Sequence, residues 1–257
     1  MVSANLTKAL FLLVTGAWHP PACYSHLKTD LASLGYDCVI PQIPSMGNST
    51  NGITWEADRD EVVSVAMSYF EQGREVILVG HSYGGVPATV ATEGQGVKDR
   101  AKKGLLGGFS SVIFLTAFAA PARGMDLLSM FGGEWPEWLD TGKPYVKNQI
   151  TRINEKGIPL LYNDATEDEA QRIFELLLPH SQDAFETPLT WSASDITIPK
   201  TFLICEDDIA FRAEFQEQLV KSIPGMREAR IAAGHSPFVG KSMQLARKLV
   251  EIAEGII

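Results

Sequence analysis

The sequence predicts an α/β fold in which a mostly parallel sheet is covered by helices on both faces. Short runs of apolar and β-branched residues alternate with segments of helical periodicity along most of the chain. Uninterrupted apolar strands are typical of parallel sheets that are buried on both sides. The chain has 257 residues, of which 45% are hydrophobic, and this is enough for one such domain with an inserted segment.

The first half of the chain supplies several expected strands, at residues 8–14, 36–40, 76–79 and 110–118. Helices are expected between them, at residues 23–34, 54–70 and 86–92. Thr54 is a favourable N-cap, and the acidic residues after it suit the positive end of a helix dipole. Residues 8–17 also match a short signal peptide, with Lys8, an apolar run and the small residue Ala17. We favour the strand, because cleavage after Ala17 would remove a central strand of the sheet.

The alternation stops after Pro121 and returns at Lys200. The intervening residues carry Gly, Pro and Trp, show no clear buried strand, and include one strongly periodic helix at residues 167–178. We interpret residues 121–198 as a cap inserted over the carboxyl edge of the sheet, and residues 1–120 and 199–257 as the core. The core then closes with strands at 201–205 and 227–232 and helices at 213–222 and 236–252.

The composition argues against several classes of function. A formal net charge of −9 and an isoelectric point near 5.1 do not suit a nucleic-acid partner, which requires clustered lysine and arginine. No apolar run reaches the length of a membrane span. The three cysteines have no regular spacing and predict neither a disulfide framework nor a zinc site. We therefore expect a cytoplasmic protein that acts on a neutral small molecule without a metal or cofactor. Two copies could pair through the cap to form a homodimer, and the sequence does not decide this.

The most specific motif is the run Gly80-His81-Ser82-Tyr83-Gly84-Gly85. It follows an apolar strand and leads into a helical segment, which matches the G-x-S-x-G pattern of a nucleophile elbow. A serine in such a strained turn leaves room for only a hydrogen atom two positions before and after it, which accounts for Gly80 and Gly84. The alternative is a serine in an ordinary glycine-rich turn. We predict that Ser82 is a nucleophile at one rim of the sheet.

A serine hydroxyl needs a base to accept its proton and a carboxylate to orient that base. Where such an elbow occurs, the acid and the histidine follow the serine in that order, each after a strand. His235 follows the last expected strand and is the predicted base. The acid lies within Glu206-Asp207-Asp208. We favour Asp208, because the other two are closer to the strand, and Asp207 remains the alternative.

The oxyanion of a tetrahedral intermediate requires backbone N–H donors. We predict the N–H of Tyr83, directly after the nucleophile, and the N–H of Ala17, in the loop after the first strand. Side chains from these loops and from the cap are expected to contact the substrate: Trp18, His19, His81, Trp135, Trp138, Leu139 and Trp191. His19 has a second interpretation as a brace for its loop, and aromatic cap residues often form a small core of their own.

These motifs together resemble the compact α/β-hydrolases that include the plant methylesterases of the salicylate-binding type and the plant hydroxynitrile lyases. The resemblance runs nearly end to end, from Gly16-Ala17-Trp18-His19 through the elbow to Glu214-Phe215-Gln216 and the final Gly234-His235. It implies an α/β-hydrolase fold with a small cap insertion. The placement of Glu214-Phe215-Gln216 within the resemblance favours Asp208 as the acid.

Departures from the lyase pattern point to the esterase side of this group. The lyases have a lysine after the catalytic histidine and a threonine in the first loop, where this chain has Ser236 and Gly16. Thr15 stands where the group commonly has a histidine. The resemblance therefore implies hydrolysis of a small, largely apolar carboxylic ester or lactone through an acyl-enzyme. Two alternatives stay open: carbon–carbon bond cleavage of the lyase type on a secondary metabolite, and a ligand receptor on the same scaffold.

Overall fold

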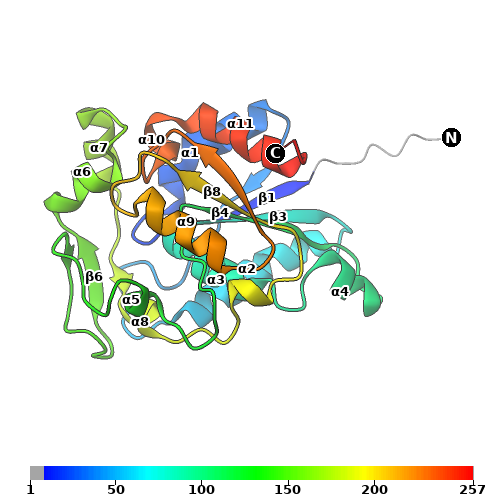
Figure 1. Cartoon of the computed structure of the whole chain (residues 1–257), viewed down its shortest axis with the longest axis horizontal. Helices are drawn as coiled ribbons and strands as arrows, with labels where there is room; N and C mark the ends of the chain where they lie inside the picture. Colours follow the sequence, from blue (N-terminus) through cyan, green and yellow to red (C-terminus); the bar gives the residue numbers. More distant parts are fainter. Residues whose placement is uncertain (1–8, 257) are drawn as a thin grey trace.

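A six-stranded parallel sheet forms the centre of the protein in the computed structural model, which describes residues 9–256 (Figure 1). The strands follow the spatial order β2-β1-β3-β4-β8-β9, and every neighbouring pair is parallel. Their bounds are Leu10–Val14 (β1), Cys38–Val39 (β2), Glu75–His81 (β3), Gly108–Leu115 (β4), Lys200–Cys205 (β8) and Met226–Ile231 (β9). The expected α/β-hydrolase architecture is confirmed, although the predicted start of the first strand at Lys8 lies outside the described residues.

Alternating residues of each strand pack against opposite layers of helices. Leu10 and Leu12 of β1 belong to the same buried cluster as the inward side of α2 and α3, whereas Phe11 and Leu13 pack with α1 and α11. Figure 1 shows α1 and α11 together on one face of the sheet and α2, α3 and α9 on the other. The core helices are α1 (Ser25–Ser33), α2 (Trp55–Phe70), α3 (Gly85–Ala91), α4 (Val97–Lys102), α9 (Ala213–Ser222), α10 (Pro237–Gly240) and α11 (Ser242–Ala253).

The segment between β4 and β8 contains a small antiparallel sheet that the sequence did not lead us to expect. Its strands, in the order β5-β6-β7, are Leu139–Asp140 (β5), Ile150–Ile153 (β6) and His180–Ser181 (β7). Strands of two to four residues are too short to show a period in the sequence. The same segment carries α5 (Leu127–Met130), α6 (Ile158–Leu161), α7 (Glu167–Phe174) and α8 (Asp183–Glu186), which lie with β6 at one side of the molecule in Figure 1.

Two helices differ in length from the expectation, for reasons in the tertiary structure. α7 ends at Phe174, and the chain then turns so that the Leu178 N–H can donate to the Trp18 carbonyl at 2.9 Å. The final helix breaks at Lys241, and a Cβ at the preceding Gly240 would lie 2.5 Å from the Asp164 carbonyl oxygen. Short 3-10 turns complete the described chain: η1 (Pro21–Tyr24), η2 (Ser82–Gly84), η3 (Glu155–Gly157) and η4 (Ala193–Asp195). None of the helices in residues 9–256 has the length and apolar character needed to cross a bilayer.

Candidate active site

The turn between β3 and α3 holds Ser82 in a strained conformation. Ser82 has a φ of 51°, in the left-handed region that side chains disfavour by about 1–3 kcal/mol. The flanking chain passes so close that a Cβ on Gly84 would lie 2.3 Å from the Val14 carbonyl oxygen, and one on Gly80 would lie 2.8 Å from the Gly84 carbonyl oxygen. Both positions therefore require glycine. The turn places the Ser82 hydroxyl at the end of the central strand, next to the loops that follow β1 and β4.

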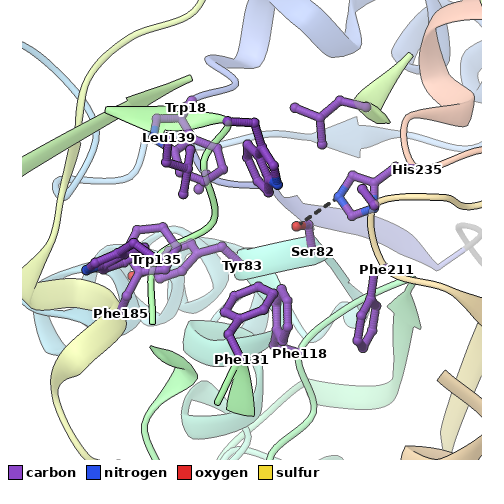
Figure 2. Close-up of a pocket in the computed structure, with 14 residues that line it drawn as sticks. Trp18, Ser82, Tyr83, Phe118, Phe131, Trp135, Leu139, Phe185, Phe211 and His235 are labelled. Carbon is purple, nitrogen blue, oxygen red and sulfur yellow. Dashed lines mark hydrogen bonds between the residues drawn. The ribbon is translucent and has the colours of Figure 1, made fainter. Parts of the chain in front are cut away.

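Three side chains from distant loops form one chain of hydrogen bonds. His235 Nε2 lies 3.1 Å from Ser82 Oγ (Figure 2), and His235 Nδ1 lies 2.8 Å from Asp208 Oδ2. Because a carboxylate accepts hydrogen bonds, Nδ1 carries the proton, and Nε2 is left to accept the proton of the serine hydroxyl. The three residues are between 3% and 8% exposed, so the chain is shielded from water. This arrangement can activate a serine as a nucleophile.

Asp208 is held by more donors than His235 alone. Thr116 Oγ1 donates to Oδ2 at 2.6 Å, and the backbone N–H groups of Ala210 and Phe211 donate to Oδ1 at 2.9 and 2.8 Å. Asp207, the alternative acid, is exposed, and its carboxylate lies near the Lys241 ammonium at 3.7 Å instead. The structure therefore brings Asp208, and not Asp207, against His235.

Gln216 fixes the loop that carries Asp208. From α9 its side-chain oxygen accepts the Cys205 N–H at 3.1 Å, and its side-chain nitrogen donates to the Phe211 carbonyl at 2.6 Å. Gln216 is fully buried. The run Glu214-Phe215-Gln216 is one of the motifs that carry the resemblance. These contacts give a physical reason for the glutamine in it.

The two expected oxyanion donors lie beside the nucleophile. Ala17 and Tyr83 both line the cavity that contains Ser82 and His235. The N–H of Tyr83 belongs to the first turn after the strand, where backbone N–H groups have no partner within the helix. The N–H of Ala17 has no hydrogen-bond acceptor among residues 9–256. Two backbone donors are thus available beside the reacting hydroxyl.

His81 lies behind the site and not in the cavity wall, so the expectation that it binds substrate is corrected. The Gly16 N–H donates to the Tyr24 hydroxyl at 2.9 Å, and that hydroxyl lies 2.8 Å from His81 Nδ1. His81 Nε2 lies 2.9 Å from the His235 carbonyl and donates to it. Burial, together with nearby His235, holds the pKa of His81 well below its usual value, so the ring is neutral. It connects the loop of Gly16 and Ala17, the turn that holds Ser82, and the loop that carries His235.

His19 and Trp191 also lie away from the cavity wall. His19 Nδ1 donates to the Ala17 carbonyl at 2.7 Å, and its Nε2 lies 2.7 Å from the Tyr162 hydroxyl. Burial lowers the pKa of His19 to about 4, so it too is neutral near pH 7. Of the two interpretations of His19, the contacts match the brace. Trp191 does not line the cavity, and its ring packs under the Arg123 guanidinium at 4.8 Å.

The cavity next to Ser82 is small and apolar. Its volume is about 30 Å³, which is room for about two water molecules. Trp18, Trp135 and Leu139 line it (Figure 2), and so does Trp138. Further wall residues were not predicted from the sequence: Phe118, Phe131, Leu161, Phe185, Ala210 and Phe211. Within residues 9–256 no group of three His, Cys, Asp or Glu side chains is placed to hold a metal ion.

A buried carboxylate behind Tyr83 is the main feature that sequence reasoning missed. Asp58 on α2 is fully buried, accepts the Ser45 N–H at 2.8 Å, and accepts hydrogen bonds from the hydroxyls of Ser45 and Tyr83. Burial raises the pKa of Asp58 to about 6, and these hydrogen bonds oppose the rise. His180 Nε2 lies 3.0 Å from Ser45 Oγ at the other side of the cluster. In the sequence, Asp58 was indistinguishable from the other acids that suit the start of a helix.

The fold and the hydrogen-bonded chain of Ser82, His235 and Asp208 define an enzyme of the ester-hydrolase class. The chain belongs to the alpha/beta hydrolase family, whose profile matches residues 11–247. The resemblance expected from the sequence is thereby confirmed at the level of the family.

Similar proteins cover most or all of the chain. Alpha/beta hydrolase nvfD of Aspergillus novofumigatus is 29% identical over 234 residues, which cover 90% of this chain and 91% of that protein. Methylesterase 1 of Arabidopsis thaliana is 23% identical over 279 residues, with 100% of both chains covered. The crystal structure of polyneuridine aldehyde esterase has a TM-score of 0.77 at 18% identity, covering 96% of this chain and 99% of that one. This last similarity concerns the fold.

Proposed function

We propose that the protein hydrolyses a small, largely apolar carboxylic ester or lactone through an acyl-enzyme on Ser82. The observation that carries the proposal is the buried pair of contacts from His235 to Ser82 Oγ at 3.1 Å and to Asp208 Oδ2 at 2.8 Å. A receptor does not need such a base. The similarity to proteins named as esterases supports the same reaction class.

In the first half of the reaction, Ser82 Oγ attacks the ester carbonyl carbon and its proton passes to His235 Nε2. The carbonyl oxygen becomes an oxyanion, which the N–H groups of Ala17 and Tyr83 stabilise. Asp208 keeps the Nδ1 proton in place and stabilises the charged ring. The bond from the carbonyl carbon to the alcohol oxygen then breaks, and His235 gives its proton to the departing alcohol.

In the second half, water replaces the alcohol. His235 Nε2 takes a proton from the water as its oxygen attacks the acyl carbon, and the same oxyanion site is used again. When the bond to Ser82 Oγ breaks, His235 returns the proton to the serine and the carboxylic acid leaves. The carbon–carbon cleaving alternative would use the same residues as acid and base but would form no acyl-enzyme.

Asp58 acts in this scheme as a positioning residue. Its carboxylate accepts a hydrogen bond from the hydroxyl of Tyr83, whose backbone N–H is one of the proposed oxyanion donors. The other attachments of Asp58, to the N–H and hydroxyl of Ser45, anchor the carboxylate to a separate loop. The network therefore limits the movement of Tyr83 relative to Ser82.

The lining of the cavity indicates the kind of substrate, and the cysteines indicate the cellular location. Apolar walls around Ser82 favour a neutral, apolar small molecule, with residues 121–198 serving as the cap that shapes the cavity. All three cysteines are free and buried, and the absence of a disulfide among them supports a reducing, cytoplasmic location. Pairing of two copies through the cap stays a prediction.

A panel of aryl acetates tests the proposal. We expect the wild-type protein to hydrolyse phenyl acetate and the Ser82→Ala variant to lose activity by about 10⁴-fold or more. Ser236→Ala is the matched control, because Ser236 is also buried near His235 but its hydroxyl has no partner within residues 9–256. Wild-type activity in Ser82→Ala, or no hydrolysis of any ester by the wild-type protein, would contradict the proposal.

A further inference from the structure

A second, larger cavity lies directly beside the catalytic cavity. Its volume is about 540 Å³, within the range of sites that bind organic molecules of moderate size. We call it the outer groove. It is lined by Phe118, Pro121, Met125, Met130, Phe131, Gly132, Ala210, Phe211, Phe215, Gln218 and Leu219. Nearly all of these residues are apolar, and Phe215 is 56% exposed to solvent.

The outer groove and the catalytic cavity share one wall. Phe118, Phe131, Ala210 and Phe211 line both of them. The ring of Phe118 packs against the rings of Phe131 and Phe211, each with centroids 4.9 Å apart. A molecule that passed this aromatic wall would reach Ser82 with one end while its other end stayed in the groove.

The members of the wall differ in how firmly they are held. The Phe118 N–H donates to the Ser82 carbonyl at 3.0 Å, and the Phe211 N–H donates to Asp208 at 2.8 Å, so both backbones are tied to the catalytic residues. Phe131 follows the short helix α5 and precedes Gly132 and Gly133, which have φ values of 88° and 83°. Neither glycine has a neighbouring atom within 4 Å of where a Cβ would stand. The N–H groups of Phe131 and Gly133 both donate to the Leu128 carbonyl at 3.0 Å, so this segment is tied to α5 and not to the catalytic residues. Phe131 is therefore the wall ring that can move aside without displacing Ser82 or Asp208.

The side of Ser82 on which the groove lies indicates which half of an ester it receives. The departing alcohol oxygen must take its proton from His235 Nε2, so the alcohol leaves on the His235 side. Figure 2 shows His235 and Phe211 on one side of Ser82, and Trp135, Leu139 and Phe185 on the other. Phe211 is also linked to His235 through Asp208. The groove thus adjoins the alcohol side, and the cavity of about 30 Å³ is left for the acyl group.

We propose that the outer groove binds the leaving alcohol of the substrate, that this alcohol is bulky and apolar while the acyl group is short, and that Phe131 controls passage to Ser82. The proposal rests on the ester hydrolysis proposed above and adds the division of the substrate between two cavities. A relative is named as a methylesterase, and a methyl ester has a small alcohol, so esters with a large and a small alcohol are the substrates to compare.

The test compares phenyl acetate with 2-naphthyl acetate, which differ in the bulk of the alcohol, and adds methyl 2-naphthoate, an isomer of the latter with the bulk on the acyl side. We expect kcat/KM of the wild-type protein to be about tenfold higher for 2-naphthyl than for phenyl acetate, since the extra ring is buried in an apolar groove. Methyl 2-naphthoate should be the poorest of the three.

Substitutions in the groove then test whether the preference for 2-naphthyl acetate arises there. Leu219→Gln should lower the naphthyl-to-phenyl ratio of kcat/KM about fivefold, because it places an amide against the second ring. Phe131→Ala should raise kcat/KM for 2-naphthyl acetate several-fold. Leu106→Gln is the matched control, since Leu106 is 63% exposed and lies outside the groove, and it should change neither rate.

Two results would overturn the groove assignment and leave ester hydrolysis standing. One is a naphthyl-to-phenyl ratio that Leu219→Gln and Phe131→Ala both leave unchanged. The other is a Leu219→Gln variant whose kcat/KM falls for methyl 2-naphthoate and not for 2-naphthyl acetate. That result would place the acyl group in the groove. A wild-type protein that hydrolyses none of the esters would contradict the proposed function, and the groove assignment with it.

Discussion

The core and the segment between β4 and β8 build the same cavity by different means. The core supplies Ser82, Asp208 and His235 from loops after β3, β8 and β9, and hydrogen bonds of 2.8 and 3.1 Å fix their mutual positions. The segment supplies Trp135 and other rings, which contact one another by packing alone, for example Trp135 on Phe185 with centroids 5.3 Å apart. Hydrogen bonds are directional and packing is not. Changes in the catalytic loops of the core should therefore lower the rate for every ester, whereas changes in the apolar walls should alter which ester is preferred.

The largest effect within this comparison is expected from Asp208→Asn. An amide cannot replace the carboxylate as the acceptor for both His235 Nδ1 and the donors around it, so the wrong tautomer of His235 is favoured. We expect kcat to fall by about 10³–10⁴-fold for every ester, as measured by steady-state kinetics. Asp207→Asn serves as the control and should stay close to wild type, because Asp207 is exposed. An equal loss in both variants would contradict the assignment of the acid.

A smaller fall in kcat is expected from Asp58→Asn. This variant tests whether the hydrogen bond from Tyr83 to Asp58 positions the proposed oxyanion donor. The asparagine places an NH2 group where Oδ2 of Asp58 now accepts hydrogen bonds from the hydroxyls of Ser45 and Tyr83, so the charged acceptor is lost and Tyr83 is held less firmly. We expect kcat to fall about tenfold with little change in KM, because the lost contact acts only on the transition state. Glu56→Gln, on the exposed side of the same helix, is the control. If the two variants have the same kcat, Asp58 does not position the oxyanion donor.

The buried histidines of the site make the core sensitive to acid. Burial lowers the pKa of His19 to about 4 and that of His180 to about 3, both below the usual value of 6.5. Each ring contributes stability that is fully present above pH 6.5 and is lost as the pH falls toward its folded-state pKa; for His19 the loss is about 3 kcal/mol. Asp58 acts in the opposite direction, since its raised pKa of about 6 adds stability as the pH falls from 6 to 4. The net expectation is a lower free energy of unfolding at pH 4.5 than at pH 7.

Urea unfolding at the two pH values measures this difference. His19→Gln should reduce the dependence of the unfolding free energy on pH, whatever its effect at pH 7. His26→Gln, at an exposed histidine, should leave the dependence as it is in the wild-type protein. Equal pH dependence in all three proteins would show that His19 is not held neutral by burial.

The smallest effect is expected in the segment between β4 and β8. Trp138 lines the catalytic cavity and packs against Trp18, and Trp138→Ala would enlarge the cavity that we assign to the acyl group. We expect kcat/KM for phenyl butyrate, relative to phenyl acetate, to rise about threefold. Trp191→Ala should not change this ratio, because Trp191 packs under Arg123 outside the cavity. An equal fall in kcat/KM for both esters in Trp138→Ala would contradict the expected difference between the two regions.

The parts of the site that could be predicted are those coded by short contiguous motifs at strand ends. The glycines around Ser82, the order of acid and histidine, and the loop with Ala17 each restrict the backbone locally, so the sequence indicates where these residues fall in the fold. Asp208 was favoured by its position in the loop after β8, and Gln216 supplies the contacts that hold that loop.

The rest of the site depends on contacts that no local pattern encodes. Phe131 and Phe211 become wall residues only because two segments about eighty residues apart in sequence pack together around Phe118. His81 was misassigned because adjacent residues of the elbow point in different directions, and its ring turns toward Tyr24 instead of the cavity. The small sheet was missed because its strands are short and have no period of their own.

Mass spectrometry of the acid-quenched protein during turnover of phenyl acetate is the most direct measurement of the central claim. The mechanism predicts a species heavier by one acetyl group, with the label on the peptide that contains Ser82 and no label in Ser82→Ala. Product formation without any acetylated protein, or acetyl found on another residue in an active protein, would contradict a covalent intermediate on this serine.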